Sequence, residues 1–77
     1  MTLKRPEQPM PALVAAALKK HKLEKAYATR PPYQRNDYLG WIARAKLEAT
    51  QKKRLEQMID ELTRGDVYMN MAWRPKA

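Results

Sequence analysis

Apolar residues recur at helical spacing along most of this chain and alternate only near its end. The clearest pattern lies in the second half, where Leu55, Met58, Ile59 and Leu62 follow at i, i+3, i+4 and i+7. That spacing places them on one face of a helix. Gly65 follows the last apolar turn, where a left-handed residue can end a helix at little steric cost. The pattern therefore predicts a helix that ends at Gly65.

A second helix is expected just upstream, bounded by prolines. The Pro31–Pro32 pair interrupts the chain, because proline disfavours helical backbone in the residue that precedes it. The helix is then expected to begin at Pro32 or Tyr33. Residues Lys46 to Ala49 are expected to join it to the last helix, with Thr50 as the N-cap of that last helix.

The first part of the chain has a helical pattern, but its apolar residues do not all fall on one face of a single straight helix. Pro11 suits the first position of a helix, and the pattern continues from there to Lys20. The next large apolar residue after Leu18 is Leu23, a step of five that a straight helix does not keep on one face. Either the helix bends near Lys20–Lys22, or it stops there and a short second helix begins.

These segments predict an all-α fold, a small bundle of three to four short helices with an extended C-terminal arm. Phenylalanine is absent, so the core depends on a few large side chains, with Trp41 expected to be a main packing residue. The core residues expected from the helical faces are Leu13, Leu18, Tyr27, Tyr38, Trp41, Ile42, Leu55, Met58, Ile59 and Leu62.

The chain changes character after Gly65. Val67, Met69, Met71 and Trp73 occupy alternate positions, a period of two that is typical of extended chain. A lone strand has no partner inside a helical bundle, so this arm is expected to fold back over an apolar groove of the same chain. Pairing with a second copy or with a partner is the alternative. Met69, Met71 and Trp73 are therefore candidate partner-binding residues.

Three regions follow from these patterns. Residues 1–10 form a proline-rich lead-in that is expected to be disordered. Residues 11–65 form the helical domain, and residues 66–77 form the arm. A chain of 77 residues makes a single small domain that buries only about 60% of its unfolded surface.

Charge and composition indicate the kind of partner and the compartment. Sixteen basic and eight acidic residues give a net charge of +8, which favours an acidic protein, nucleic acid or another anion as partner. A basic surface that only confers solubility is the alternative. The absence of cysteine fits a reducing compartment, and no apolar run approaches the ~20 residues of a membrane span. A cytoplasmic protein is expected, as a monomer, with a homodimer through the arm as the alternative.

The residues needed for catalysis are scarce. The chain has one histidine, no cysteine and no serine, so a nucleophile–base pair lacks its usual members. Asp60 and Glu61 are adjacent on a helix and point about 100° apart, so they do not form a carboxylate pair. No residues have the spacing of metal ligands. We expect a protein that is not an enzyme and has neither a metal nor a cofactor.

A basic run opens the last predicted helix. Lys52, Lys53 and Arg54 lie in its first turn, where the helix dipole repels cations, and such a local conflict can mark a site. With Thr50 they form a candidate anion-binding set, because free N–H groups and basic side chains suit phosphate or carboxylate. A solvated face paired with nearby glutamates is the alternative. In a helix-turn-helix arrangement the same residues would open a recognition helix, so DNA or RNA binding is a second hypothesis.

The order of these features resembles a known bacterial family. A proline-led PALVAAAL is followed by LEKAYATRPP, then by YLGWIARAK and ATQKKRLEQMIDELTRG. This order is similar to the helical domain of the YdeI-like, OmpD-associated, bacteriocin-protection family. The run from Thr50 to Arg54 departs from the family pattern, because Gln51 replaces an arginine. The resemblance implies a compact, non-catalytic helical module of uncharacterised molecular role, linked to tolerance of antimicrobial peptides.

Overall fold

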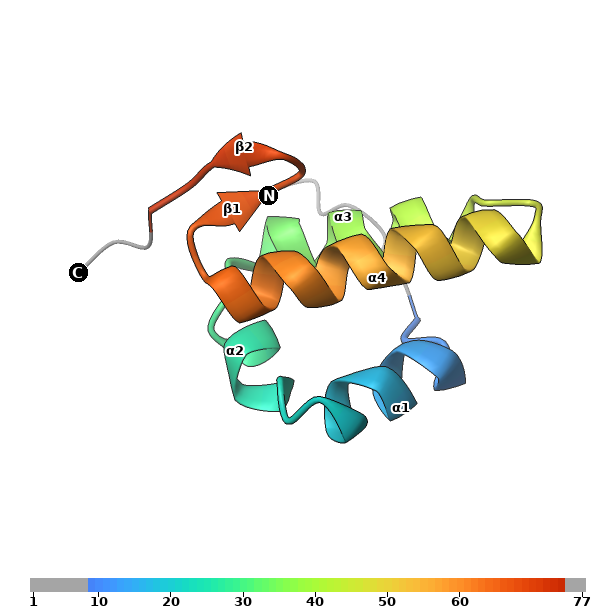
Figure 1. The fold of residues 1–77 in the computed structure, drawn as a ribbon, viewed down its shortest axis with the longest axis horizontal. Coiled ribbons are helices and arrows are strands. Elements are labelled where there is room, and N and C mark those ends of the chain that lie inside the picture. Colours follow the sequence, from blue (N-terminus) through green and yellow to red (C-terminus); the bar gives the residue numbers. More distant parts are fainter. Residues whose placement is uncertain (1–8, 75–77) are drawn as a thin grey trace, which may run out of the picture.

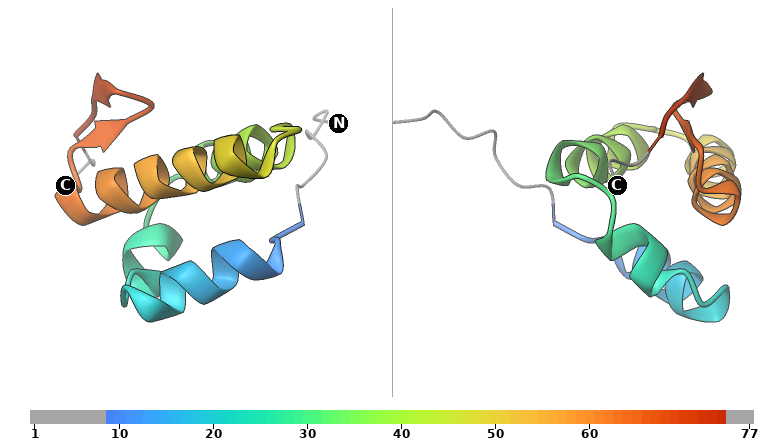
Figure 2. Two further views of the ribbon diagram at one scale, coloured as in Figure 1. Left: turned by 45° about the vertical axis from the view of Figure 1, so that its right-hand side comes forward. Right: turned by 90° about the vertical axis from the view of Figure 1, so that its left-hand side faces the viewer.

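The computed structural model describes residues 9–74, so all but the last two residues of the predicted lead-in lie outside the described residues. Helices α3 and α4 lie side by side, and α1 and α2 pack together across one side of that pair (Figures 1 and 2). The described chain is mostly helical, which confirms the all-α prediction. Its elements are α1 (Ala12–Lys20), α2 (Glu24–Ala28), α3 (Pro32–Ala43), α4 (Glu48–Arg64), β1 (Val67–Tyr68) and β2 (Met71–Ala72).

The phase shift after Leu18 is a helix end and not a bend. Lys22 has a φ of 56°, in the left-handed region, and reverses the chain there. The Leu23 amide donates to the carbonyl of Leu18 at 2.8 Å, and the Lys22 amide donates to that of Lys19 at 3.2 Å. These are the two hydrogen bonds of a Schellman motif, which usually has glycine at the left-handed position. The second of the two alternatives is therefore correct, and α2 begins as a separate helix.

The ends of α3 and α4 depend on different signals. Helix α3 begins at Pro32, one of the two residues expected from the sequence. Helix α4 begins at Glu48, so the expectation of Thr50 as its N-cap is wrong. Leu47 has the extended backbone of an N-cap, and the carboxylate of Glu48 favours the first turn through the helix dipole. At the other end, Gly65 has a φ of 82°, which confirms its expected role in ending the helix.

The core lies where the four helices meet. Leu13 is a correction to the expected core, because 39% of its surface is exposed while Val14 and Leu18 of the same helix are buried. Neighbouring residues on a helix point about 100° apart, and Val14 and Leu18 share the inward face at i and i+4. Of the other expected core residues, the buried ones are Leu18, Tyr27, Tyr38, Ile42, Met58 and Leu62, and the partly buried ones packed against them are Trp41, Leu55 and Ile59.

The tail is a β-hairpin, so the expectation of a single extended arm is wrong. Val67 pairs with Ala72 and Tyr68 with Met71 in an antiparallel register. The intervening Met69 and Asn70 have φ values of 49° and 64°, the pattern of a two-residue type I′ turn. The alternation of apolar residues concealed this turn, because it continues through the turn without interruption. The hairpin lies back against the helices, with Tyr68 and Met69 packed on the core.

Candidate functional site

A buried arginine joins the helices to the tail. Arg30 lies between α2 and α3, directly before the proline pair, and only 4% of its surface is exposed. Its Nη1 donates to Gln34 Oε1 at 3.1 Å and to the carbonyl of Val67 at 2.9 Å, and its Nη2 donates to the carbonyl of Glu61 at 3.0 Å. All three acceptors are neutral oxygens. The side chain therefore links α3, α4 and β1 while its positive charge remains available to the surroundings.

The indole of Trp73 covers this arginine. The guanidinium carbon of Arg30 lies 4.4 Å from the ring centroid, within the range of a cation–π contact. The Trp73 amide donates to the carbonyl of Asp66 at 2.9 Å, which fixes the chain at the open end of the hairpin. The indole stays partly exposed. One side of it thus closes over Arg30, while the rest can contact a partner.

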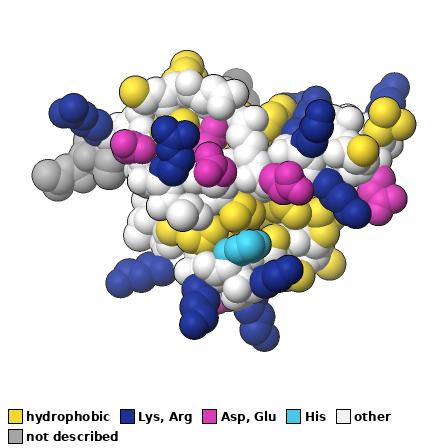
Figure 3. All heavy atoms as spheres, viewed as in Figure 1, with side chains coloured by type: hydrophobic (Ala, Val, Ile, Leu, Met, Phe, Trp, Pro, Cys, Tyr) yellow, Lys and Arg dark blue, Asp and Glu magenta, His cyan; other side chains and the backbone are white. Residues whose placement is uncertain are grey.

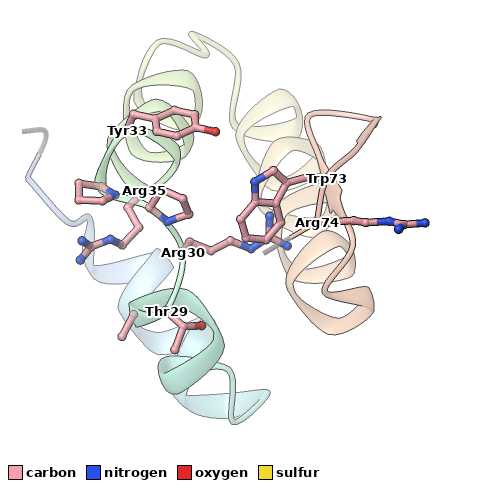
Figure 4. A pocket seen from close by; sticks show the side chains of 9 residues that line it. Thr29, Arg30, Tyr33, Arg35, Trp73 and Arg74 are labelled. Carbon is pink, nitrogen blue, oxygen red and sulfur yellow. The ribbon is translucent and has the colours of Figure 1, made fainter. Parts of the chain in front are cut away.

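A hollow opens beside this pair, and we call it the arginine–tryptophan hollow. Its volume is about 760 Å³, and none of the described residues that line it is acidic. Figure 4 shows Arg30 beneath Trp73 in the middle, Arg35 on one side, and Arg74 extending outward on the other. The three guanidinium groups are therefore spread along the hollow and do not converge on one point. The lining residues are Ala28, Thr29, Arg30, Pro31, Pro32, Tyr33, Arg35, Trp73 and Arg74.

Arg35 has an unused donor. Its Nε is buried and has no hydrogen-bond partner among the described residues. Burial raises the pKa of the nearby Tyr27 phenol, and the charge of Arg35 acts in the opposite direction to lower it. A buried N–H without an acceptor is costly, so this donor is a local cost to the stability of the fold.

On α4, a buried carboxylate holds the turn of the hairpin. Only 1% of the surface of Glu61 is exposed, and its carboxylate accepts hydrogen bonds from four donors. Burial raises the pKa of Glu61, but the hydrogen bonds together lower it by more than burial raises it. The pKa of Glu61 therefore lies below its usual value. The donors are Tyr38 Oη, Gln57 Nε2 at 3.1 Å, and the amides of Met69 at 2.8 Å and Asn70 at 2.9 Å.

The Tyr38 phenol that meets this carboxylate is itself shifted. Its burial and its hydrogen bond to Glu61 both raise its pKa. Glu61 is therefore ionised and Tyr38 neutral near pH 7, and the pair forms one end of a polar network inside the fold. Because Glu61 fixes the turn, it also positions Trp73, which follows three residues later.

The predicted anion-binding set is not gathered into one pocket. Lys52 and Lys53 are exposed, whereas Arg54 donates to the carbonyl of Trp41 and lies over that indole at 5.3 Å. Because α4 begins at Glu48, the basic run falls in its second turn, beyond the free amides of the helix start. Anion binding at this run stays a prediction. The free amides of the helix start, which were part of its rationale, do not lie beside these side chains.

The predicted partner-binding residues of the tail differ in exposure. Met71 is 58% exposed, Trp73 covers Arg30, and Met69 packs against the core. Met69 is thus largely used inside the fold, and Trp73 is the residue that lines the hollow.

Sequence reasoning missed Arg30, Tyr33 and Arg35, since it treated the segment around Pro31–Pro32 only as a break between helices. The one available signal was the density of arginine and aromatic residues around two prolines. Within residues 9–74, no group of three or more histidine, cysteine, aspartate or glutamate side chains could hold a metal ion. No helix in that part of the chain is long and apolar enough to cross a membrane.

The comparison with protein families is consistent with this architecture. A family model described as "Bacteriocin-protection, YdeI or OmpD-Associated" matches residues 7–65. That range includes all four described helices and stops at Gly65, so the hairpin and Trp73 lie beyond it. No curated protein and no solved structure matches the chain. On the strength of the matched helical region, the chain belongs to the bacteriocin-protection, YdeI or OmpD-associated family.

Proposed function

We propose that this protein is a non-catalytic binding module that takes an acidic, extended segment of a partner protein into the arginine–tryptophan hollow. The observation that carries the proposal is the lining of the hollow. It combines three arginines with two aromatic side chains and contains no acidic residue among those described. Guanidinium groups bind carboxylates through paired, charge-assisted hydrogen bonds.

The spread of the arginines favours an extended ligand over a compact anion. Arg35 and Arg74 lie on opposite sides of Arg30 in Figure 4, so a single phosphate would not reach both. Arg30 already donates three hydrogen bonds within the fold and contributes mainly its charge. Direct contacts to partner carboxylates would come from the terminal NH₂ groups of Arg35, which is partly exposed and lines the hollow, and from the exposed Arg74.

The aromatic side chains add a second element of recognition. Tyr33 is 51% exposed and Trp73 is partly exposed, and both line the hollow. Rings of this kind in grooves receive proline or apolar side chains of extended peptides. The net charge of +8 would speed the encounter with an acidic partner.

The test is the binding of a fluorescein-labelled peptide of alternating glutamate and proline, followed by fluorescence anisotropy. A neutral peptide of glutamine and proline with the same length is the ligand control. Arg35→Gln should weaken binding of the acidic peptide about tenfold or more, since a hydrogen bond to a charged group contributes about 1.5–3 kcal/mol. Trp73→Ala should also weaken it, and high salt should reduce binding without abolishing it.

Arg64→Gln is the matched protein control. Arg64 is an exposed arginine that pairs with Asp60 at 3.7 Å on α4, and it does not line the hollow. The Arg64→Gln variant loses the same charge as the Arg35→Gln variant. It should bind the acidic peptide within about twofold of wild type, since exposed charges contribute little individually. Equal weakening by the two variants, or no preference for the acidic peptide, would refute the proposal.

The family description associates the family with bacteriocin protection. A basic hollow on a basic protein repels a cationic peptide, so direct capture of such a peptide is disfavoured. We therefore propose that any contribution to antimicrobial-peptide tolerance runs through an acidic protein partner.

A further inference from the structure

A second basic surface lies on a different face of the fold, where α1 meets α2. We call it the lysine corner, and it consists of Lys19, Lys20, Lys22 and Lys25 together with His21. All five side chains are exposed, and the one acidic residue between positions 19 and 25 is Glu24. Figure 3 shows basic side chains projecting along the lower edge of the molecule, over α1 and α2.

The backbone at the centre of this corner is in an unfavourable conformation for lysine. Lys22 has a φ of 56° at the left-handed position of the Schellman motif. Glycine is the usual residue there, and a side chain with a Cβ costs about 1 kcal/mol in that conformation. The chain thus places a charged side chain at a position where local stability favours glycine. Such local conflicts are concentrated at functional surfaces.

The lysines of the corner are free of partners within residues 9–74. No ion pair or side-chain hydrogen bond engages any of them in that part of the chain. Two basic residues of α4 differ in this respect, since Arg54 binds the Trp41 carbonyl and Arg64 pairs with Asp60. The corner is therefore a concentration of positive charge that the described fold does not neutralise.

The surroundings of the corner favour the phosphate backbone of a nucleic acid over a lipid surface. The large apolar side chains that are exposed in the described residues all lie outside residues 19–28. Insertion into a membrane interface needs such side chains. Tyr27, the one aromatic residue of α2, is buried, so the imidazole of His21 is the one ring in the corner on which an unpaired base could stack.

We propose that the lysine corner binds the phosphate backbone of duplex nucleic acid without sequence preference. Lysine ammonium groups are point charges on flexible stems and suit a row of phosphates better than one bidentate anion. Four contacts give a slope of log K against log salt of about −3.6, which is about a 150-fold loss of affinity between 50 and 200 mM salt. This surface is separate from the arginine–tryptophan hollow, so either proposal can fail alone.

The experiment titrates the full chain into a labelled duplex of mixed sequence over that salt range, with anisotropy as the readout. Changing all four corner lysines to glutamine should reduce the salt-dependent loss to less than about tenfold. A matched variant removes the same number of charges from other exposed positions and should keep the wild-type slope. Its changes are Arg44→Gln, Lys46→Gln, Lys52→Gln and Lys53→Gln.

A second measurement uses the unaltered chain and so does not depend on how the variants fold. Lysine acetylation is mapped by mass spectrometry with and without the duplex, and the corner lysines should be protected while Lys46, Lys52 and Lys53 are not. Protection confined to those three lysines, or equal loss of binding in the two variants, would overturn the proposal. So would tighter binding to phosphatidylcholine–phosphatidylserine vesicles than to duplex with the same dependence on the corner.

Discussion

Replacing Glu61 by glutamine should detach the hairpin from the helices and lower the free energy of unfolding by about 3 kcal/mol. The carboxylate accepts from four donors, two of which are the turn amides of Met69 and Asn70. A glutamine side chain keeps one acceptor oxygen and turns an NH₂ group toward donors. At least two hydrogen bonds to a charged acceptor are then lost, each contributing about 1.5–3 kcal/mol.

Detachment of the hairpin limits this cost. The two-residue strands can separate from the helices, after which water satisfies the turn amides. We therefore take the lower end of the range, about 3 kcal/mol, which is still a large share of the roughly 4–12 kcal/mol expected for a chain of this length. Amide hydrogen exchange of Met69 and Asn70 should accelerate more than that of the core helices.

Urea unfolding followed by far-ultraviolet circular dichroism gives the magnitude, and Glu56→Gln is the control. Glu56 lies on the same helix but is exposed, so this change should cost less than about 0.5 kcal/mol. An equal effect of the two substitutions would refute the reasoning, as would unchanged exchange at the turn amides.

The same carboxylate predicts a pH dependence. The pKa of Glu61 is lower in the folded chain than in the unfolded chain, where it is about 4.3. Its stabilisation is therefore fully present above the unfolded value and is lost as the pH falls through the folded value. Wild type should lose stability on acidification below about pH 4 more steeply than Glu61→Gln, which lacks this titration. Parallel pH profiles for the two proteins would contradict this assignment.

Three further substitutions, two of them with a matched control substitution, test other parts of the fold by urea unfolding. Lys22→Gly should raise the free energy of unfolding by about 0.5–1 kcal/mol by relieving the left-handed backbone, and Lys22→Ala, which keeps a Cβ, should show no such gain. Arg30→Lys should cost about 2 kcal/mol, because an ammonium group cannot reproduce the fork that reaches three acceptors; a cost below 0.5 kcal/mol would show that this fork is not needed. Leu18→Ala should cost about 2–5 kcal/mol and Leu13→Ala less than about 1 kcal/mol, since only the first is buried, and similar costs at both positions would contradict the observed helix phase.

Helices were predictable because their signals are local. The spacing of Leu55, Met58 and Leu62 places these residues on one face wherever the helix packs, and Gly65 ends the helix through its own backbone freedom. The error at Leu13 arose where two neighbouring apolar residues compete for one inward position. The pattern of ALVAAAL does not decide between them, and only packing against α4 selects Val14.

The hairpin was not predictable from alternation alone. A type I′ turn is usually marked by Asn-Gly, and here Met69 and Asn70 occupy the two positions. What compensates for a methionine at positive φ is the distant carboxylate of Glu61, which binds both turn amides. This contact spans eight and nine residues and depends on the tail returning along α4, so no local pattern contains it.

The arginine–tryptophan hollow was even less predictable from local sequence patterns. Arg30 and Trp73 are 43 positions apart in sequence, yet the indole lies on the guanidinium at 4.4 Å. The fixed register of the hairpin brings them together, and that register depends on Glu61. Loss of the Glu61 carboxylate should therefore weaken binding at the hollow without altering any residue that lines it. If Glu61→Gln binds the acidic peptide as tightly as wild type does while its turn amides exchange freely, Trp73 does not contribute to the site.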